Sequence, residues 1–177
     1  MTRRVVTGRD GSGASTFASD GPAPWCASFA SVPGFEVSML WATGGTVAPS
    51  IEHLEESGKW PESWVPAADE SRVLLVTFPP DAVFASDGFD GMAAHREQME
   101  KLPGLAEAFE ADNPGMHTTQ TLDYGVVLSG EIHLELDNGQ MRKLKPKDFV
   151  VQRATRHAWR NLSAEPATVL FVLLGSK

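Results

Sequence analysis

The sequence predicts an all-β fold, a barrel or sandwich, with a short helical insertion in the middle of the chain. Two observations support this class. Short apolar segments of alternating polarity recur from residue 115 to residue 174, and tight-turn sequences separate them. Between residues 91 and 112, by contrast, apolar residues recur near helical spacing. The length of 177 residues predicts a single domain, 1–177, because domains have roughly 100–200 residues.

The first half, residues 1–90, predicts strands and loops that extend the sheets of a barrel. Turn residues at 9–13 separate two short β segments, and Pro79-Pro80 ends the last strand of this half. Residues 43–70 predict a long loop, and its role as a lid or as a dimer contact stays open. The expected strands are 5–7, 15–18, 35–42 and 72–78.

The helical insertion, residues 91–112, begins after Asp90, a suitable N-cap. Met92, Met99 and Leu102 recur near helical spacing, so we expect their side chains to pack in the core. Pro103 ends this helix and precedes a second short one through 105–109.

The remaining residues, 115–174, predict only strands and tight turns. The Asn138-Gly139 pair is a strong hairpin signal, because both central residues of such a turn tolerate positive φ. Pro146 fits the second position of a turn over 145–148. The expected strands are 124–128, 131–136, 141–144, 149–151, 158–159 and 167–174.

The composition excludes several classes of protein. Hydrophobic residues make up 42% and charged residues 21%, which excludes a wholly disordered chain. With a net charge of −8, the chain lacks the excess of basic residues that contacts with phosphates need, so we expect no nucleic acid partner. The longest apolar run, 167–174, is too short to span a bilayer. A single cysteine, Cys26, suits a reducing compartment. We therefore expect a cytoplasmic protein without a membrane partner.

Two polar segments of the β region carry side chains that are suited to chemistry. In the first, His117, Thr119 and Asp123 share one face if the segment is extended, because side chains alternate with a period of two. In the second, His157 and Trp159 share a face by the same rule. These two segments are the candidate site.

The order and spacing of these residues resemble the motifs of the cupin superfamily. His117-x-Thr119 is followed by Asp123 and Gly130, as in the first cupin motif, and His157 with Asn161 resembles the end of the second. The resemblance covers residues 115–174. It implies a jelly-roll barrel, or double-stranded β-helix, with the residues of both motifs pointing into its cavity.

The resemblance also implies a metal site, although the motif is incomplete. Thr119 stands where the family has a second metal histidine, and Asp123 replaces a glutamate. His117, Asp123 and His157 remain as metal ligands, a set that suits non-haem iron or zinc. Manganese or nickel would also fit, so the identity of the divalent ion stays open. The alternatives are a metal-free pocket or a purely structural role.

The expected function is an enzyme that acts on a small oxygenated organic molecule. Oxygenase, decarboxylase, dehydratase and isomerase chemistry all fit a metal-dependent cupin. The alternatives are a metal-free lyase or isomerase, with His157 or Asp123 as catalytic base, and a non-catalytic small-molecule-binding protein. The expected substrate-binding residues are Thr119, Gln152, Trp159 and Arg153.

Two further expectations concern the surface. Arg153, Arg156 and Arg160 lie around His157 in the sequence, and they would attract a carboxylate or enolate substrate or form a solvated rim. The turn-rich N-terminal half has strands but no complete core pattern of its own. We therefore expect a homodimer in which these strands or sheets pair between protomers.

Overall fold

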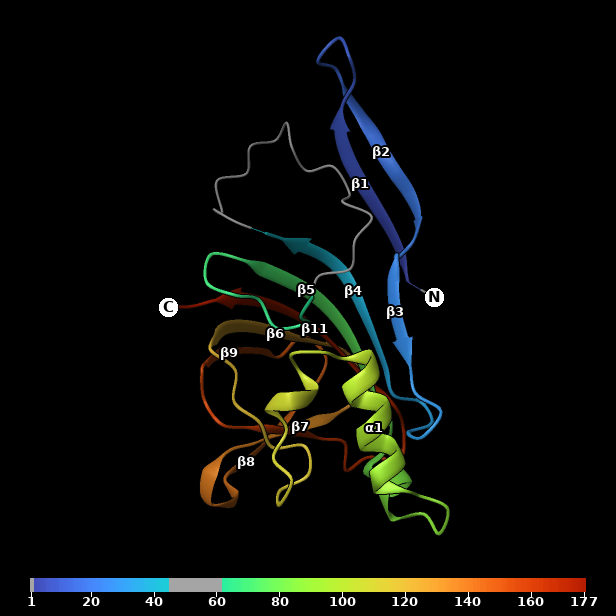
Figure 1. Cartoon of the computed structure of the whole chain (residues 1–177), viewed down its shortest axis with the longest axis vertical. Helices are drawn as coiled ribbons and strands as arrows, with labels where there is room; N and C mark the ends of the chain where they lie inside the picture. Colours follow the sequence, from blue (N-terminus) through green and yellow to red (C-terminus); the bar gives the residue numbers. More distant parts are fainter. Residues whose placement is uncertain (1, 45–61) are drawn as a thin grey trace.

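The computed structural model describes residues 2–44 and 62–177 and confirms the all-β class (Figure 1). The strands are β1 (Arg3–Arg9), β2 (Ser15–Pro22), β3 (Trp25–Ser28), β4 (Glu36–Thr43), β5 (Ser71–Phe78), β6 (Thr121–Ser129), β7 (Ile132–Glu135), β8 (Met141–Leu144), β9 (Phe149–Arg153), β10 (Ala158–Arg160) and β11 (Ala167–Gly175). The helical elements are α1 (Gly91–Lys101) and the 3-10 helices η1 (Asp81–Ala85), η2 (Ala106–Ala108) and η3 (Asp137–Gly139).

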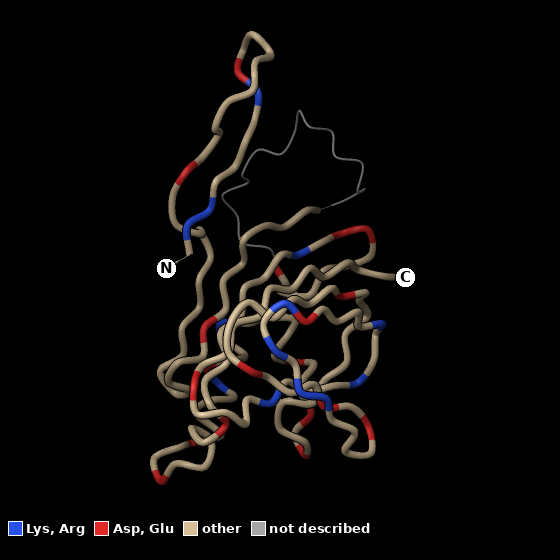
Figure 2. The backbone as a smooth tube through the Cα atoms, turned by 180° about the vertical axis from the view of Figure 1, so that it is seen from behind, with Lys and Arg blue, Asp and Glu red and all other residues tan. Residues whose placement is uncertain are grey.

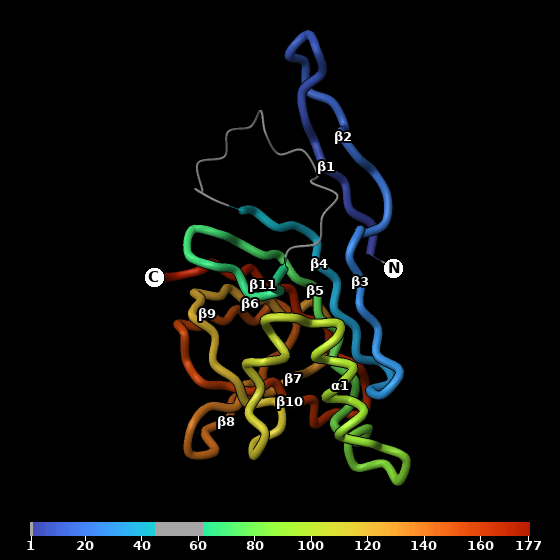
Figure 3. Tube along the Cα trace, in the orientation of Figure 1, coloured from blue at the N-terminus to red at the C-terminus, as the bar shows by residue number. Residues whose placement is uncertain are grey.

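Two antiparallel sheets form the barrel. The larger has the strand order β3-β4-β5-β11-β6-β9, and the smaller has the order β10-β7-β8 (Figure 3). The hydrophobic core joins them, since Val127 and Val169 of the larger sheet belong to the same buried cluster as Ile132 of the smaller. β5 pairs along its whole length with β11, so the first half of the chain extends the barrel sheet as the sequence predicts.

The first two strands form a separate two-stranded sheet. This β1–β2 arm projects away from the barrel (Figure 1). Its turn is held by Asp10, whose Oδ1 accepts hydrogen bonds from the backbone N–H groups of Ser12 and Ala14. The predicted strands 5–7 and 15–18 lie inside β1 and β2.

The turns of the second half follow the predicted chemistry. Asn138 and Gly139 both have positive φ, 59° and 68°. Lys147 also has a positive φ, 79°, in the turn that begins at Lys145-Pro146. This position favours glycine, because a Cβ is strained in the left-handed region. The chain therefore accepts a strained lysine there.

The helix begins where the sequence predicts, but it packs on a different face. The Asp90 side chain caps α1 by accepting from the N–H groups of residues 92 and 93. The prediction that Met92 and Met99 pack in the core is wrong, because they are 73% and 38% exposed, while Leu102 is fully buried. The helix instead meets the barrel through the small Ala94 and through polar contacts of Glu97.

Glu97 fixes the helix to the loop that follows β3. Its carboxylate accepts hydrogen bonds from the backbone N–H groups of Ala30 and Ser31 at 2.9 and 2.8 Å. It also pairs with Lys101, which donates to the Ser28 carbonyl. The Lys101 bond, followed by the Ser31 bond, lowers the pKa of Glu97 to about 2. A charged anchor therefore replaces the methionine contacts that the spacing indicates.

The predicted long loop, residues 43–70, lies partly outside the described residues. Its described end places Trp64 in the core, where the backbone N–H of Trp64 donates to the Pro103 carbonyl.

Acidic and basic positions are interspersed along the barrel trace (Figure 2). In the described part of the chain, no helix is long and apolar enough to cross a membrane.

Candidate functional site

His117 and His157 lie next to each other inside the barrel. Their backbones form an isolated antiparallel bridge, in which each N–H donates to the other residue's carbonyl at 2.9 and 3.0 Å. Their ring centroids are 4.1 Å apart. The two motifs, forty residues apart in the sequence, thus bring one imidazole each to a single point.

Both imidazoles are held in the same way. Nδ1 of His117 lies 3.1 Å from the Gly115 carbonyl, and Nδ1 of His157 lies 2.9 Å from the Thr155 carbonyl. A carbonyl only accepts, so each Nδ1 carries the proton and each Nε2 keeps its lone pair. This arrangement, a backbone acceptor on one ring nitrogen and a free lone pair on the other, is typical of metal-binding histidines.

Both rings are neutral at pH 7. Burial lowers the pKa of His117, despite the opposing hydrogen bond to Gly115. Burial lowers the pKa of His157 further, to about 3, and the neighbouring His117 adds to the effect. Neutral imidazole is the form that binds metals, whereas an imidazole with so low a pKa is a poor base.

Asp123 brings a buried carboxyl group from β6. It is only 7% exposed, and its Oδ1 finds no hydrogen-bond partner among the described residues. Burial raises the pKa of Asp123 to about 6, against a smaller lowering effect of the Thr121 hydroxyl. Asp123 is therefore a stronger base than His157, and it changes charge close to neutral pH.

Gln152 links β6, the strand that carries Asp123, to His157. It lies on β9 directly opposite Asp123, and it is buried. Its amide nitrogen lies 2.7 Å from Nε2 and 2.6 Å from Nδ1 of His157. Since Nδ1 already donates to Thr155, the amide hydrogen goes to Nε2. Gln152 therefore occupies one of the two free imidazole lone pairs.

Trp159 and Thr119 complete the interior. The Trp159 ring meets His157 edge-on, with centroids 6.3 Å apart, and also packs against Phe171 and Phe78. The buried Thr119 hydroxyl is 2.8 Å from that of Thr121. Trp159 thus separates the imidazole from the apolar core, as a cavity wall would.

The arginines lie elsewhere. Arg153 is exposed, and it alternates with the buried Gln152, so it lies on the opposite face of β9. Arg156 forms ion pairs with Glu110 and Asp137. Arg160 pairs with Glu135 and donates to the Pro114 carbonyl. The Arg156 and Arg160 guanidinium groups are held by the protein's own acceptors.

Sequence reasoning missed one aromatic neighbour of this site. Phe109, which the pattern places in a helix, follows η2 and forms a β-bridge with His117. Its ring packs edge-on against the imidazole, with centroids 4.9 Å apart. An aromatic residue eight positions before His117 is the only sequence signal of this contact. Asn161, which matches the second motif, instead holds the loop 161–165 through its side chain.

The donor set at the histidine pair fits a divalent metal, and the part of Asp123 in the predicted triad stays a prediction. His117 and His157 offer neutral imidazoles with Nδ1 anchored. Among residues 2–44 and 62–177, however, no three His, Cys, Asp or Glu side chains lie close enough to hold an ion. β6 begins at Thr121, so residues 117–123 are not one extended strand.

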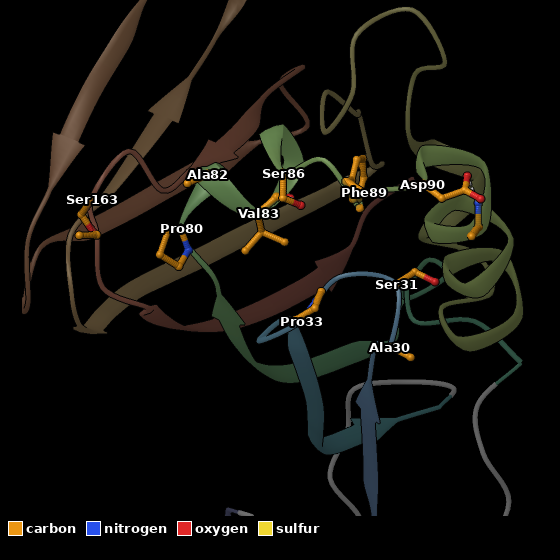
Figure 4. A pocket seen from close by; sticks show the side chains of 13 residues that line it. Ala30, Ser31, Pro33, Pro80, Ala82, Val83, Ser86, Phe89, Asp90 and Ser163 are labelled. Atoms are coloured by element: carbon orange, nitrogen blue, oxygen red, sulfur yellow. Dashed lines mark hydrogen bonds between the residues drawn. The ribbon is translucent and has the colours of Figure 1, made fainter.

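A separate hollow lies outside the histidine site (Figure 4). It has a volume of ≈ 840 Å³ and lies between the loop 30–33, the η1 region and the start of α1. Pro33, Val83 and Phe89 give it apolar walls. None of the predicted site residues lines this hollow, so its size says nothing about the chemistry of the histidines.

Comparison with known proteins identifies the segment that carries the site. Residues 109–173 match the family model described as Cupin domain. Phomopsin biosynthesis cluster protein C' of Diaporthe leptostromiformis is 52% identical over 63 residues, 35% of this chain and 33% of that protein. Cupin-domain-containing oxidoreductase fogC of Aspergillus ruber is 36% identical over 97 residues, 53% of this chain and 46% of that protein. The matched segments thus span less than half of either relative.

Among solved structures, a Cupin 2 conserved barrel domain protein from Salinispora arenicola CNS-205 is similar at a TM-score of 0.41 and 13% identity. The similarity covers 79% of this chain and 75% of that chain.

Proposed function

Residues 109–173 of this chain form a cupin domain, and we propose that its barrel is the active site of an enzyme acting on a small oxygenated organic molecule. The observation that supports this most is the pair of anchored, neutral imidazoles, together with a buried carboxyl group that has an unpaired oxygen. A buried unpaired oxygen costs folding free energy, roughly 1–3 kcal/mol, so it needs a role that offsets this cost.

We propose that His117 and His157 bind one divalent transition metal through Nε2, with iron, zinc, manganese and nickel all open. A bound ion would act as a Lewis acid toward a substrate oxygen or support redox chemistry. The oxidoreductase name of the fogC relative favours the redox choice over decarboxylation, dehydration or isomerisation. The amide of Gln152 would have to turn away from His157 for that lone pair to be used.

We propose that Asp123 is the proton acceptor of the site and lies outside the metal coordination. Its Oδ1 has no hydrogen-bond partner among the described residues, so it is free to accept a proton from a substrate hydroxyl or an activated C–H. The proton then resides on Oδ1. Gln152 lies on β9 directly opposite Asp123 of β6, so it fixes which residue of β9 faces the carboxylate. Trp159 shields His157 from the barrel's apolar core, and Thr119 offers a hydroxyl to the ligand.

The second candidate is a metal-free lyase or isomerase. It is favoured by the contact of the Gln152 amide with the His157 lone pair. In that case Asp123, rather than His157, is the base, because its pKa is about 6 and that of His157 is about 3. A non-catalytic binding protein would have the same interior but no turnover.

Elemental analysis of protein purified without chelator separates these candidates. The metal-dependent proposal expects about one equivalent of a transition metal in the wild type and its loss in His157→Ala. A wild type that is free of metal but still turns over a substrate contradicts metal dependence and supports the second candidate. Screening hydroxylated and carbonyl compounds for oxygen uptake or absorbance change then distinguishes an enzyme from a binding protein.

A further inference from the structure

The inward-facing residues of the larger sheet form layers across the barrel, and one of these layers is polar. Strand register places Arg72 of β5 opposite Leu173 of β11, and Leu173 opposite Asp123 of β6. Asp123 in turn lies opposite Gln152 of β9. All four residues are buried. Because directly opposite residues share a face of the sheet, Arg72 lies in the same layer of the barrel as the buried carboxyl group.

The next layer, at the end of the barrel, is filled by backbone from another segment. It contains Gly175, which lies opposite Thr121 and two positions beyond Leu173. Side chains alternate along a strand with a period of two, so the open side of Gly175 faces inward. A Cβ on Gly175 would clash with the carbonyl group of Ala67. The backbone of residues 66–67 therefore closes the barrel end over the layer that contains the carboxyl group.

We call residues 63–70, which lead into β5, the strap. In Figure 1 the strap is the green trace that enters β5. One end of it is anchored where α1 finishes, since the buried Trp64 donates its backbone N–H to the Pro103 carbonyl at 2.9 Å. Gly104 has a φ of 82°, and a Cβ there would clash with the Ser63 side chain. A glycine thus permits the close approach of the strap at each of its two contacts with the barrel.

The buried guanidinium group of Arg72 holds both ends of the strap. Its Nε donates to the Ser63 carbonyl at 3.2 Å, and its Nη2 donates to Oε2 of Glu70 at 2.7 Å. The same carboxylate oxygen accepts from the backbone N–H of Ala67 at 3.1 Å. Nη1 of Arg72 donates to one backbone carbonyl of β4 and one of β5. The cation in the carboxyl layer therefore binds the chain's own strap and strand ends.

The contacts of the strap divide it into a fixed part and a part that can move. Trp64 is 1% exposed and belongs to the core, so it fixes the first end. Residues 67–69 are exposed, and this second part is held by the Glu70 carboxylate and by the bond from the Gly175 N–H to the Glu70 carbonyl. A segment with few buried apolar contacts opens at a lower cost than the whole fold. The strap can therefore lift from the barrel end while Trp64 stays in place.

We propose that Arg72 and Glu70 are positioning residues whose ion pair holds the strap closed over Asp123, and that the strap lifts to admit a ligand. This role depends on the proposed barrel site and on neither the metal nor the reaction. The described end of the predicted long loop is then a lid rather than a dimer contact.

Covalent labelling of carboxyl groups tests access to Asp123. A water-soluble carbodiimide with glycinamide converts accessible carboxyl groups into amides, and peptide mass spectrometry gives the rate at each position. In Gly175→Ala the added Cβ displaces the Ala67 carbonyl, and in Glu70→Ala the strap loses the acceptor of two hydrogen bonds. We expect Asp123 to be labelled at least about fivefold faster in each variant than in the wild type, because the strap opens more often.

Each strap variant has a matched control. Gly21→Ala adds the same methyl group on the β1–β2 arm, where nothing lies within 4 Å of the new Cβ. Glu131→Ala removes a carboxylate whose ion pair, with Lys143, lies at the smaller sheet. Both controls should label Asp123 at the rate of the wild type. An equal acceleration in a control and in its strap variant would contradict the proposal.

Hydrogen exchange shows whether the strap opens locally. In the wild type, the amides of residues 70 and 175 should exchange faster than those of residues 169–173, and this needs no variant to fold. The strap variants should accelerate exchange at 70 and 175 alone. Equal exchange at all these amides in the wild type would mean that the strap opens only on unfolding and would overturn the proposal. Faster exchange in the variants with unchanged labelling of Asp123 would also overturn it. Neither measurement uses a metal or a substrate, so the strap is tested separately from the proposed function.

Discussion

Replacement of Asp123 by asparagine should stabilise the metal-free protein at neutral pH and do little at acidic pH. The change keeps the shape of the side chain and its Oδ1, and it removes the titratable proton. Burial raises the folded-state pKa of Asp123 to about 6, from its ordinary value of 3.8. Its folded state therefore favours the protonated form, and the stabilisation is complete below pH 3.8 and is lost as pH rises through 6.

The magnitude follows from the difference between the two pKa values. A difference of about two units at about 1.36 kcal/mol each corresponds to about 3 kcal/mol of lost stability above pH 7. Asparagine avoids this loss, so the free energy of unfolding of Asp123→Asn should exceed that of the wild type by about 2–3 kcal/mol at pH 7.5. At pH 4 the two proteins should differ by less than about 1 kcal/mol.

The assay is urea unfolding at pH 4 and pH 7.5 with chelator present, monitored by circular dichroism. His157 also titrates between folded and unfolded states, but it is common to both proteins and cancels in their difference. An equal difference at both pH values, or a less stable variant at pH 7.5, would show that the ionised carboxylate is well solvated or paired. Either result refutes the buried, unpaired Asp123 described above.

Three further predictions concern the helix anchor, a turn and the barrel interior. Glu97→Ala should lower the free energy of unfolding by about 1–3 kcal/mol, because it removes two hydrogen bonds from backbone N–H groups, at about 0.5–1.5 kcal/mol each. Met92→Ala should stay within about 0.5 kcal/mol in urea unfolding, and equal effects of the two changes would indicate that the helix packs through its methionines. Lys147→Gly should raise the thermal midpoint, since the positive φ costs lysine about 1 kcal/mol, and a lower midpoint would mean that the lysine side chain stabilises the turn. Trp159→Ala should cost about 3–5 kcal/mol, while Trp159→Phe folds but changes ligand affinity; a fully tolerated alanine would place the indole outside the core.

The sequence anticipates what local chemistry determines. The Asn138-Gly139 turn and the Asp90 cap appear as predicted, because a positive φ and an N-cap depend on a few adjacent residues. The meeting of His117 and His157 follows from the resemblance to cupin motifs, since nothing local links residues forty positions apart.

One failure has its origin in long-range packing. Periodicity predicts a helix that begins after Asp90 and ends before Pro103, but it does not say which side of the helix meets the barrel, and the anchor is Glu97. Even spacing places His117 and Asp123 on one face only if the chain is extended throughout, and β6 begins at Thr121. The shared face of these two residues therefore stays a prediction.

In the proposed metal site, the anchored imidazoles of His117 and His157 bind the ion without Asp123. Calorimetric titration of chelator-stripped protein with Zn²⁺ tests it most directly. We predict one equivalent bound by the wild type, by Thr119→Ala and by Asp123→Asn, and affinity lowered at least tenfold in His117→Ala and His157→Ala. Binding that survives both histidine changes, or is lost in Asp123→Asn with the fold intact, would contradict the account.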